Sequence, residues 1–238
     1  MTATPEPADP GHATAEAARP PVVDLLDRLR AIPRPERLLS PEREQALTAR
    51  QRELLDELGA LVDNGFADLT MAGLAARLSC SLRTLYELAP SRDELVLLVV
   101  DRNLWRIGRQ AAAVIEPDMA PLDALRAYLA ATTMAVAGLR EPFARDVAAV
   151  PAAQRVYDAH SEYIIAVARE LLDMAVERGD IAPVDTAAVA RVMAGVGREF
   201  ARPEVLATLR SPPKDAADTV VEVMLAGLRA RNRAASPG

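Results

Sequence analysis

The sequence of 238 residues is poor in several residue types, and each scarcity excludes something. A single cysteine, Cys80, excludes an intramolecular disulfide and any metal site built from several thiolates. Aromatic residues make up 3% of the chain and there are 11 glycines, so Leu, Val and Ala must fill the core. A core of that kind favours packed helices over a β-sandwich. We therefore expect an all-α protein without a metal or other cofactor.

Long apolar runs and excess positive charge are also lacking. No run of about eighteen apolar residues occurs, and no basic stretch leads into an apolar one at the N-terminus, so we expect a cytoplasmic protein with no membrane partner. The net charge of −6 gives no general reason to expect nucleic acid as a partner. Any such role must depend on local geometry. The basic residues are almost all arginine, with Lys214 as the one lysine, and arginine forms forked contacts to phosphate and guanine.

Proline clusters and helical periodicity divide the chain into four parts. Residues 1–40 are expected to be a flexible extension, with a possible short helix at 22–30. Residues 41–95 form a first domain, 96–232 a second, and 233–238 a flexible tail. Apolar spacing predicts helices at 42–63, 70–78, 81–88, 91–115, 122–136, 142–150, 151–178, 185–200 and 217–228.

The stretch from 70 to 95 contains three helix-start signals in close succession. Thr70 and Ser81 are N-cap residues of short helices, and Ser91 with Glu94 three residues later is the pattern of a capping box. Three short helices with a tight turn between the second and third are typical of the helix-turn-helix, in which the third helix enters the DNA major groove.

The residue types at the start of the third helix suit DNA contact. Ser81 and Thr84 expose hydroxyls and amides where the helix dipole favours a phosphate. Arg83 suits a guanine edge, Leu82 a thymine methyl, and Tyr86 a phosphate or a methyl. We expect all five side chains at a DNA interface.

The segments "LTMAGLAARL" and "SLRTLYELAPSRDEL" resemble the DNA-binding motif of the TetR family of bacterial transcriptional regulators. The motif covers roughly residues 45 to 100. The resemblance implies a homodimer on a two-fold double-stranded operator and a small, apolar ligand that shifts the 91–115 helix. It also adds Thr70 and Arg92 to the DNA-contacting residues, with Arg92 where the family usually has a phosphate-binding lysine.

Three features depart from the family pattern. Ser79 stands where glycine is usual, so a left-handed backbone there would carry strain. Leu88 and Ala89 replace an aromatic or histidine and a phenylalanine, which removes a phosphate contact and a core filler. Residues 41–95 contain six arginines and ten acids, a net of −4, so counterion release should be modest. We expect the arginines of residues 19–52 to compensate as an arm in the minor groove.

The second domain supplies the candidates for ligand and subunit contacts. His160 interrupts an apolar helix face, as either a hydrogen-bonded core residue or a polar group in a ligand cavity. The aromatic and methionine residues of this part are likewise core or cavity wall. The candidate ligand residues are Trp105, Met134, Phe143, His160 and Tyr163. The candidate dimer residues, core or interface, are Val189, Val192, Val196, Val220 and Met224.

Two other functions compete with a ligand-controlled regulator, for which repression is the expected mode. The same fold without DNA binding would act as a ligand sink or bind another protein, and the acidic first domain favours that alternative. A helical enzyme is disfavoured, because the chain has two histidines, one of them His12 in the extension, and no Ser-His-Asp arrangement or carboxylate pair stands out.

Overall fold

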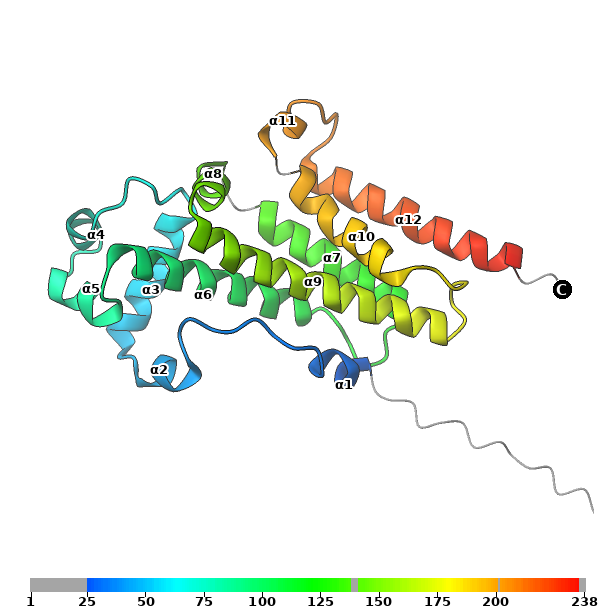
Figure 1. Cartoon of the computed structure of the whole chain (residues 1–238), viewed down its shortest axis with the longest axis horizontal. Coiled ribbons are helices and arrows are strands. Elements are labelled where there is room, and N and C mark those ends of the chain that lie inside the picture. Colours follow the sequence, from blue (N-terminus) through cyan, green and yellow to red (C-terminus); the bar gives the residue numbers. More distant parts are fainter. Residues whose placement is uncertain (1–24, 138–140, 201, 236–238) are drawn as a thin grey trace, which may run out of the picture.

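The computed structural model describes residues 25–137, 141–200 and 202–235 (Figure 1). Within these ranges the secondary structure is helical throughout, so the predicted all-α fold is confirmed. No helix in them is long and apolar enough to cross a membrane. The helices are α1 Leu25–Arg30, α2 Pro41–Ala46, α3 Ala49–Val62, α4 Met71–Arg77, α5 Leu82–Leu88, α6 Arg92–Ala112, α7 Pro121–Ala137, α8 Glu141–Ala149, α9 Pro151–Glu177, α10 Thr186–Phe200, α11 Pro203–Leu206 and α12 Pro213–Ala235.

Two hydrophobic cores lie at opposite ends of the elongated molecule (Figure 1). The head core joins α3, α4, α5, α8 and the first part of α6, with Leu54, Leu85 and Leu95 fully buried. The body core joins α7, α9, α10, α12 and the end of α6, with Leu125 and Leu171 fully buried. We call these two units the head and the body. Helix α6 runs through both, so it fixes one unit against the other.

The helix expected at 42–63 is two helices, and this prediction was wrong. Leu47 is extended, and Thr48 starts α3 with a capping box. The Thr48 hydroxyl accepts the Gln51 N–H at 3.2 Å, and the Gln51 side chain accepts the Thr48 N–H at 2.9 Å. Because two amides at the helix start are satisfied in this way, a second start within the apolar pattern is favoured over one continuous helix.

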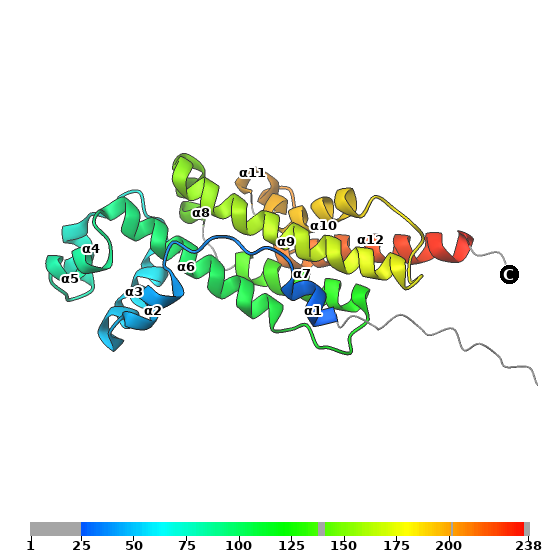
Figure 2. The ribbon, with the colours of Figure 1, turned by 60° about the horizontal axis from the view of Figure 1, so that its bottom comes forward.

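The N-terminal extension expected to be flexible is packed where the structure describes it. Leu25 and Leu29 of α1 are buried in the body core, and Leu39 is buried in the head core. Residues 31–40 run between them along the side of α6 and α9 (Figures 1 and 2). Residues 1–24 and 236–238 lie outside the described ranges, so the extension and tail predictions are not tested there.

Candidate nucleic-acid interface

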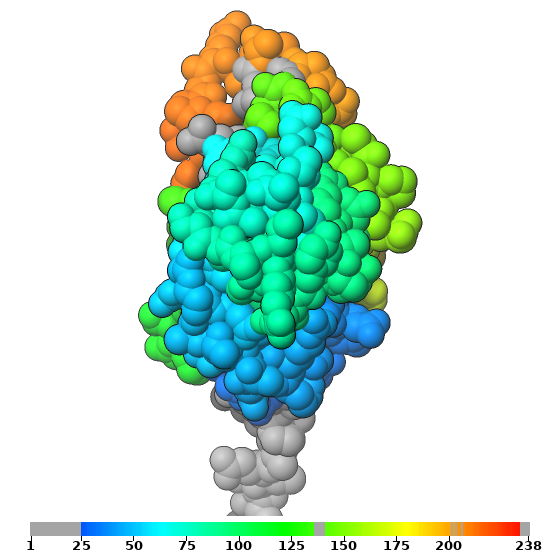
Figure 3. All heavy atoms as spheres, turned by 90° about the vertical axis from the view of Figure 1, so that its left-hand side faces the viewer, coloured from blue at the N-terminus to red at the C-terminus, as the bar shows by residue number. Residues whose placement is uncertain are grey.

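Helix α5 lies at the end of the head that is farthest from the body. Figure 3 looks onto this end, where α4 and α5 form the middle of the surface and α2 and α3 lie below them. Leu85 and Leu88 point inward and are 0% and 2% exposed. The other face of α5 meets solvent, so the helix presents one face to an outside partner.

Three of the predicted DNA-contacting side chains project from that outer face. Leu82 is 45% exposed and Tyr86 is 53% exposed, although apolar and aromatic groups of this size are usually covered. The Arg83 side chain is 89% exposed and makes one ion pair, 3.1 Å from the Glu87 carboxylate. An exposed i,i+4 pair is weak. Arg83 can therefore leave Glu87 for a stronger partner at little cost.

The caps of the two short helices are formed as predicted. The Ser81 hydroxyl accepts the Thr84 N–H at 3.1 Å and lies 2.8 Å from the Thr84 hydroxyl. The Thr70 hydroxyl accepts the Gly73 N–H at 3.0 Å at the start of α4. Ser79 has φ of +49°, so the left-handed turn residue expected between α4 and α5 is present. The turn therefore forms without glycine.

Arginines fix the head by donating to main-chain carbonyls. Arg43 of α2 donates to the Leu88 carbonyl at 2.8 Å, at the last residue of α5. Arg50 of α3 donates to the Leu78 carbonyl at 3.1 Å, at the end of α4. Both positions suit a cation, because the carbonyls at a helix C-terminus carry partial negative charge. These carbonyl contacts were not predicted for either residue, because nothing in the local pattern shows which carbonyl an arginine will reach.

Arg92 does not stand free to bind a phosphate. It donates to the carbonyls of Leu69 at 2.8 Å and Ala67 at 2.9 Å, and also to the carbonyl of Phe66. Its side chain is 25% exposed. The resemblance suggested a backbone clamp on DNA, but this arginine holds the loop between α3 and α4. An arginine that reaches several carbonyls retains these hydrogen bonds, because each one is charge-assisted.

The same loop is held from the other side by α8. Asp146 is buried and accepts the N–H groups of Phe66 at 2.5 Å and Ala67 at 2.8 Å. Phe143 packs edge to face on Phe66, with ring centroids 6.1 Å apart. Gly65 has φ of +104°, and a Cβ there would lie 2.8 Å from Pro142, so glycine is required at this position. Helix α8 therefore holds the loop between α3 and α4 in place within the head.

Residues 25–40 of the arginine-bearing arm lie along the body and α6, whereas Arg43 of α2 reaches the end of α5. Helix α1 is on the body, and Arg28 pairs with Glu170 and Glu177 of α9. Arg37 pairs with Glu44 at 2.9 Å. Arg28 and Arg37 are therefore held by carboxylates of the protein itself, and contact of the arm with a minor groove stays a prediction.

The five predicted ligand residues do not line one site. Trp105 and His160 lie together, with ring centroids 5.5 Å apart, and Tyr163 packs against the body core. Phe143 belongs to the head core, as described above, and Met134 is 59% exposed on α7. Phe143 and Met134 are therefore corrections to the predicted set. Helical periodicity identified apolar faces but not the unit each face packs into.

The predicted dimer residues divide into covered and open positions. Val192 of α10 is 57% exposed, and Val223 of α12, which was not predicted, is 67% exposed. Val189, Val220 and Met224 are half-buried. Val196 is 8% exposed on α10, which favours the core alternative for this residue. The open apolar positions therefore lie on α10 and α12, which pack side by side.

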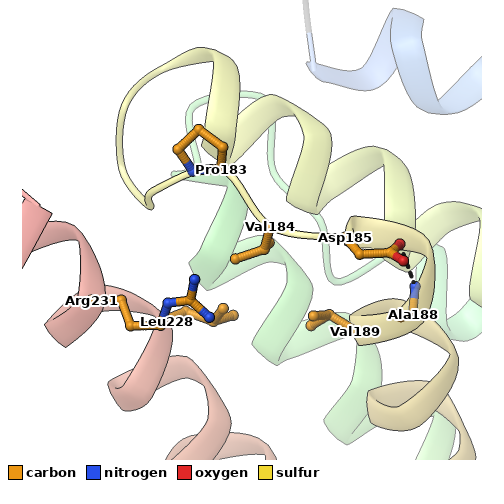
Figure 4. Close-up of a pocket in the computed structure, with 7 residues that line it drawn as sticks. All are labelled: Pro183, Val184, Asp185, Ala188, Val189, Leu228 and Arg231. Atoms are coloured by element: carbon orange, nitrogen blue, oxygen red, sulfur yellow. Dashed lines mark hydrogen bonds between the residues drawn. The ribbon is translucent and has the colours of Figure 1, made fainter.

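A shallow groove of about 630 Å³ lies between the loop before α10 and the last part of α12. Figure 4 shows its apolar lining of Val184, Val189 and Leu228, with the Arg231 side chain lying across it. Asp185 is turned to the α10 backbone, where it accepts the Ala188 N–H at 3.0 Å. None of the five predicted ligand residues lines this groove. The described residues also contain no group of three or more His, Cys, Asp or Glu side chains that would hold a metal ion.

No protein-family model and no curated protein sequence matches the chain. Solved structures do match it. A TetR transcription regulator from Haloarcula marismortui ATCC 43049 is 16% identical, with a TM-score of 0.64, over 76% of this chain and 99% of that one. A regulatory protein of the TetR family from Rhodococcus RHA1 is 18% identical, with a TM-score of 0.58, over 76% and 98%. A Saccharomonospora viridis protein solved in complex with choline is 15% identical, with a TM-score of 0.61, over 74% and 94%.

Proposed function

We propose that this chain, which has the fold of TetR-family transcriptional regulators, is a sequence-specific, DNA-binding regulator. In this proposal it acts in the cytoplasm as a homodimeric repressor, and a small molecule bound to the body controls it. One observation supports the DNA-binding role most strongly. Leu82, Arg83 and Tyr86 project from the outer face of a helix whose backbone is fixed by its neighbours.

The outer face of α5 fits the chemistry of the major groove. The guanidinium of Arg83 forks onto the O6 and N7 atoms of a guanine, a contact that contributes about 1 to 3 kcal/mol of discrimination. Leu82 contacts a thymine methyl, and the Tyr86 hydroxyl reaches a phosphate. Ser81 and Thr84, at the start of the helix, set its orientation on the backbone of the duplex.

Dimerisation follows from the small size of the reading helix. With 7 residues, α5 reaches few base pairs, so two copies on a two-fold operator must share the recognition. The open face of α10 and α12 supports a dimer, with Val192 and Val223 as its most exposed apolar side chains. A Cβ on Gly195 or Gly227 would meet no atom within 4 Å, so a second helix can approach closely there.

In this proposal a small molecule that binds to the body controls DNA binding. The choline complex of the Saccharomonospora viridis protein shows that one protein of this fold binds a small molecule. For this chain we retain Trp105, His160 and Tyr163 as the candidate contacts, on α6 and α9. A ligand that binds one arrangement of these helices more tightly moves α6 and favours the DNA-free state by its differential affinity.

Selection of bound duplexes from a random pool tests the DNA-binding role. The wild-type protein at low salt should enrich a two-fold symmetric sequence. A Leu82→Ala, Arg83→Ala, Tyr86→Ala variant, which changes only exposed side chains, should enrich none while keeping its helical circular dichroism. A wild-type protein that is folded and dimeric but enriches no sequence would overturn the proposal.

That negative result would favour the alternative function, a ligand-binding or protein-binding regulator of the same fold. One observation supports this alternative. The region 41–95 has a net charge of −4, and Arg43, Arg50 and Arg92 are engaged with carbonyls of the head. Capture of a defined protein partner by the wild type, in the absence of DNA, would then be the informative experiment.

A further inference from the structure

The segment from α1 to α2 connects the two cores by a route separate from α6. Leu25 and Leu29 are buried in the body core, Leu39 is buried in the head core, and Leu47 packs against the head core. We call residues 31–40, which run between α1 and α2, the strap. Figures 1 and 2 show it lying along the side of the molecule from the body to the head. Its two ends are therefore anchored in different units.

The body end of the segment is fixed by α1. Arg28 donates to Glu170 and to Glu177, two carboxylates seven residues apart on α9, with its Nη2 atom 3.1 Å from the Glu177 Oε1 atom. The hydrogen bonds that Arg28 donates to Glu177 and Glu170 raise the pKa of Arg28, while partial burial lowers it. A forked arginine between two carboxylates holds its helix in one register. Arg30, on the same helix, pairs with Asp27 of α1 itself and makes a matched control.

The middle of the strap lies on a buried polar pair. The Leu38 N–H donates to the Asp101 Oδ2 atom at 3.0 Å, and the Asp101 Oδ1 atom lies 2.9 Å from the His160 Nε2 atom. Asp101 is 3% exposed and His160 is 8% exposed. The Arg37 guanidinium lies 4.6 Å from the ring centroid of Trp105, and the edge of His160 packs on the same indole. The strap thus covers Trp105, the only tryptophan of the chain.

The head end of the segment reaches the reading helix itself. Glu44 of α2 pairs with Arg37 at 2.9 Å and with Arg102 of α6 at 3.6 Å, which holds α2 against the strap and α6. Arg43, one residue earlier, donates to the Leu88 carbonyl at the end of α5 at 2.8 Å. Charge and geometry both favour this contact, since the last carbonyls of a helix attract a cation.

We propose that residues 25–46 position α5 relative to the body, with Arg43 as the positioning residue at the reading helix and Arg28 as the anchor on α9. The segment fixes the direction in which Leu82, Arg83 and Tyr86 point, although it contacts no base. The consequence for DNA rests on the proposed function, whereas the mechanical link does not. A change at the body end of α9 that displaces α1 is therefore transmitted to α5 through the strap.

Two variants with matched controls test the link without DNA. Arg28→Ala should increase acrylamide quenching of Trp105 fluorescence about twofold and speed amide hydrogen exchange in residues 31–40, because local opening follows the loss of an anchor. Arg30→Ala should change neither. Arg43→Ala should speed amide exchange in the last turn of α5, and Arg43→Lys, which keeps a donor, should restore much of the protection. Exchange and quenching equal to wild type in Arg28→Ala and Arg43→Ala would overturn the proposal.

The same variants test the effect on recognition. On the duplex selected by the wild type, Arg43→Ala and Arg28→Ala should each weaken specific binding about tenfold, equivalent to about one hydrogen bond, with unchanged affinity for unrelated duplex. Equal loss on both duplexes, or no loss on either, would contradict a positioning role. If the wild type selects no duplex, the proposed function fails, and the fluorescence and exchange measurements still decide whether the strap links body and α5.

Discussion

The head and the body are both helical, yet different interactions hold them together. The body consists of long helices packed through Leu, Ala and Val, such as the 27 residues of α9. The head contains α2 to α5, of 6, 14, 7 and 7 residues, together with α8 and the start of α6. Helices of one or two turns bury too little surface to fix their own orientation. In the head, side chains bonded to main-chain groups supply the missing constraints.

Arginine use shows the difference most clearly. In the head, Arg43, Arg50 and Arg92 donate to carbonyls at the ends of α5, α4 and the loop after α3, and Arg50 and Arg92 pair with carboxylates as well. In the body, arginines such as Arg191 pair with carboxylates on exposed surfaces. A net charge counts arginines bonded to carbonyls and arginines paired with carboxylates in the same way. The acidic balance of residues 41–95 therefore says little about how α5 is held, and fewer head arginines are free for phosphates than the sequence suggests.

The largest effect on stability should come from the body core. Leu171 is 0% exposed on α9, so Leu171→Ala should lower the free energy of unfolding by about 3 kcal/mol through lost burial and a residual cavity. Urea unfolding followed by circular dichroism measures it. A decrease in the free energy of unfolding of less than about 1 kcal/mol would mean that apolar packing is not what holds the body together.

The head should respond most to the loss of a buried hydrogen-bond acceptor. Asp146→Ala leaves the N–H groups of Phe66 and Ala67 without their acceptor, and we expect a loss of about 2 kcal/mol. Amide exchange should speed up in residues 63–70 and stay unchanged in α10. Glu141→Ala, which removes an exposed carboxylate on the same helix, is the control. Uniform acceleration over both units would contradict a local role.

Removing a polar group that is buried in the body core should increase stability. The Tyr128 hydroxyl has no hydrogen-bond partner among the described residues, and burial raises the pKa of Tyr128. The folded state therefore disfavours the tyrosinate. The contribution of neutral Tyr128 to the free energy of unfolding is fully present below the ordinary tyrosine pKa of about 10 and is lost as the pH rises above it. Tyr128→Phe should stabilise the protein by about 1 kcal/mol at pH 7. Tyr128→Phe should also reduce the decrease in the free energy of unfolding between pH 7 and pH 10.5. Urea unfolding at both pH values measures this decrease.

The smallest effect should come from the turn of the head. Ser79 adopts a left-handed backbone, which costs a non-glycine residue free energy. Ser79→Gly should therefore stabilise the protein by about 0.5 kcal/mol, after the greater entropy of glycine in the unfolded chain is subtracted. Ser79→Ala, with the same backbone restriction as serine, should give no gain. Differential scanning calorimetry of the three proteins provides the comparison.

The features predictable from the sequence are those determined by neighbouring residues. The caps at Thr70, Ser81 and Ser91 and the outward placement of Leu82 and Arg83 all follow from short patterns. The features that were missed join distant residues. Asp146 meets Phe66 across 80 positions and Asp101 meets His160 across 59, and no local pattern encodes such partners. The carbonyl partners of Arg92 were missed for the same reason.

The most direct test of the central claim is the base preference of Arg83. Binding of the wild type and of Arg83→Ala should be measured on duplexes that vary one base pair at a time within the selected site. The account predicts that one guanine per half-site, favoured about tenfold by the wild type, loses that preference in Arg83→Ala, with little change on unrelated duplex. If Arg83→Ala retains the full preference at every position, α5 does not read DNA through its exposed face.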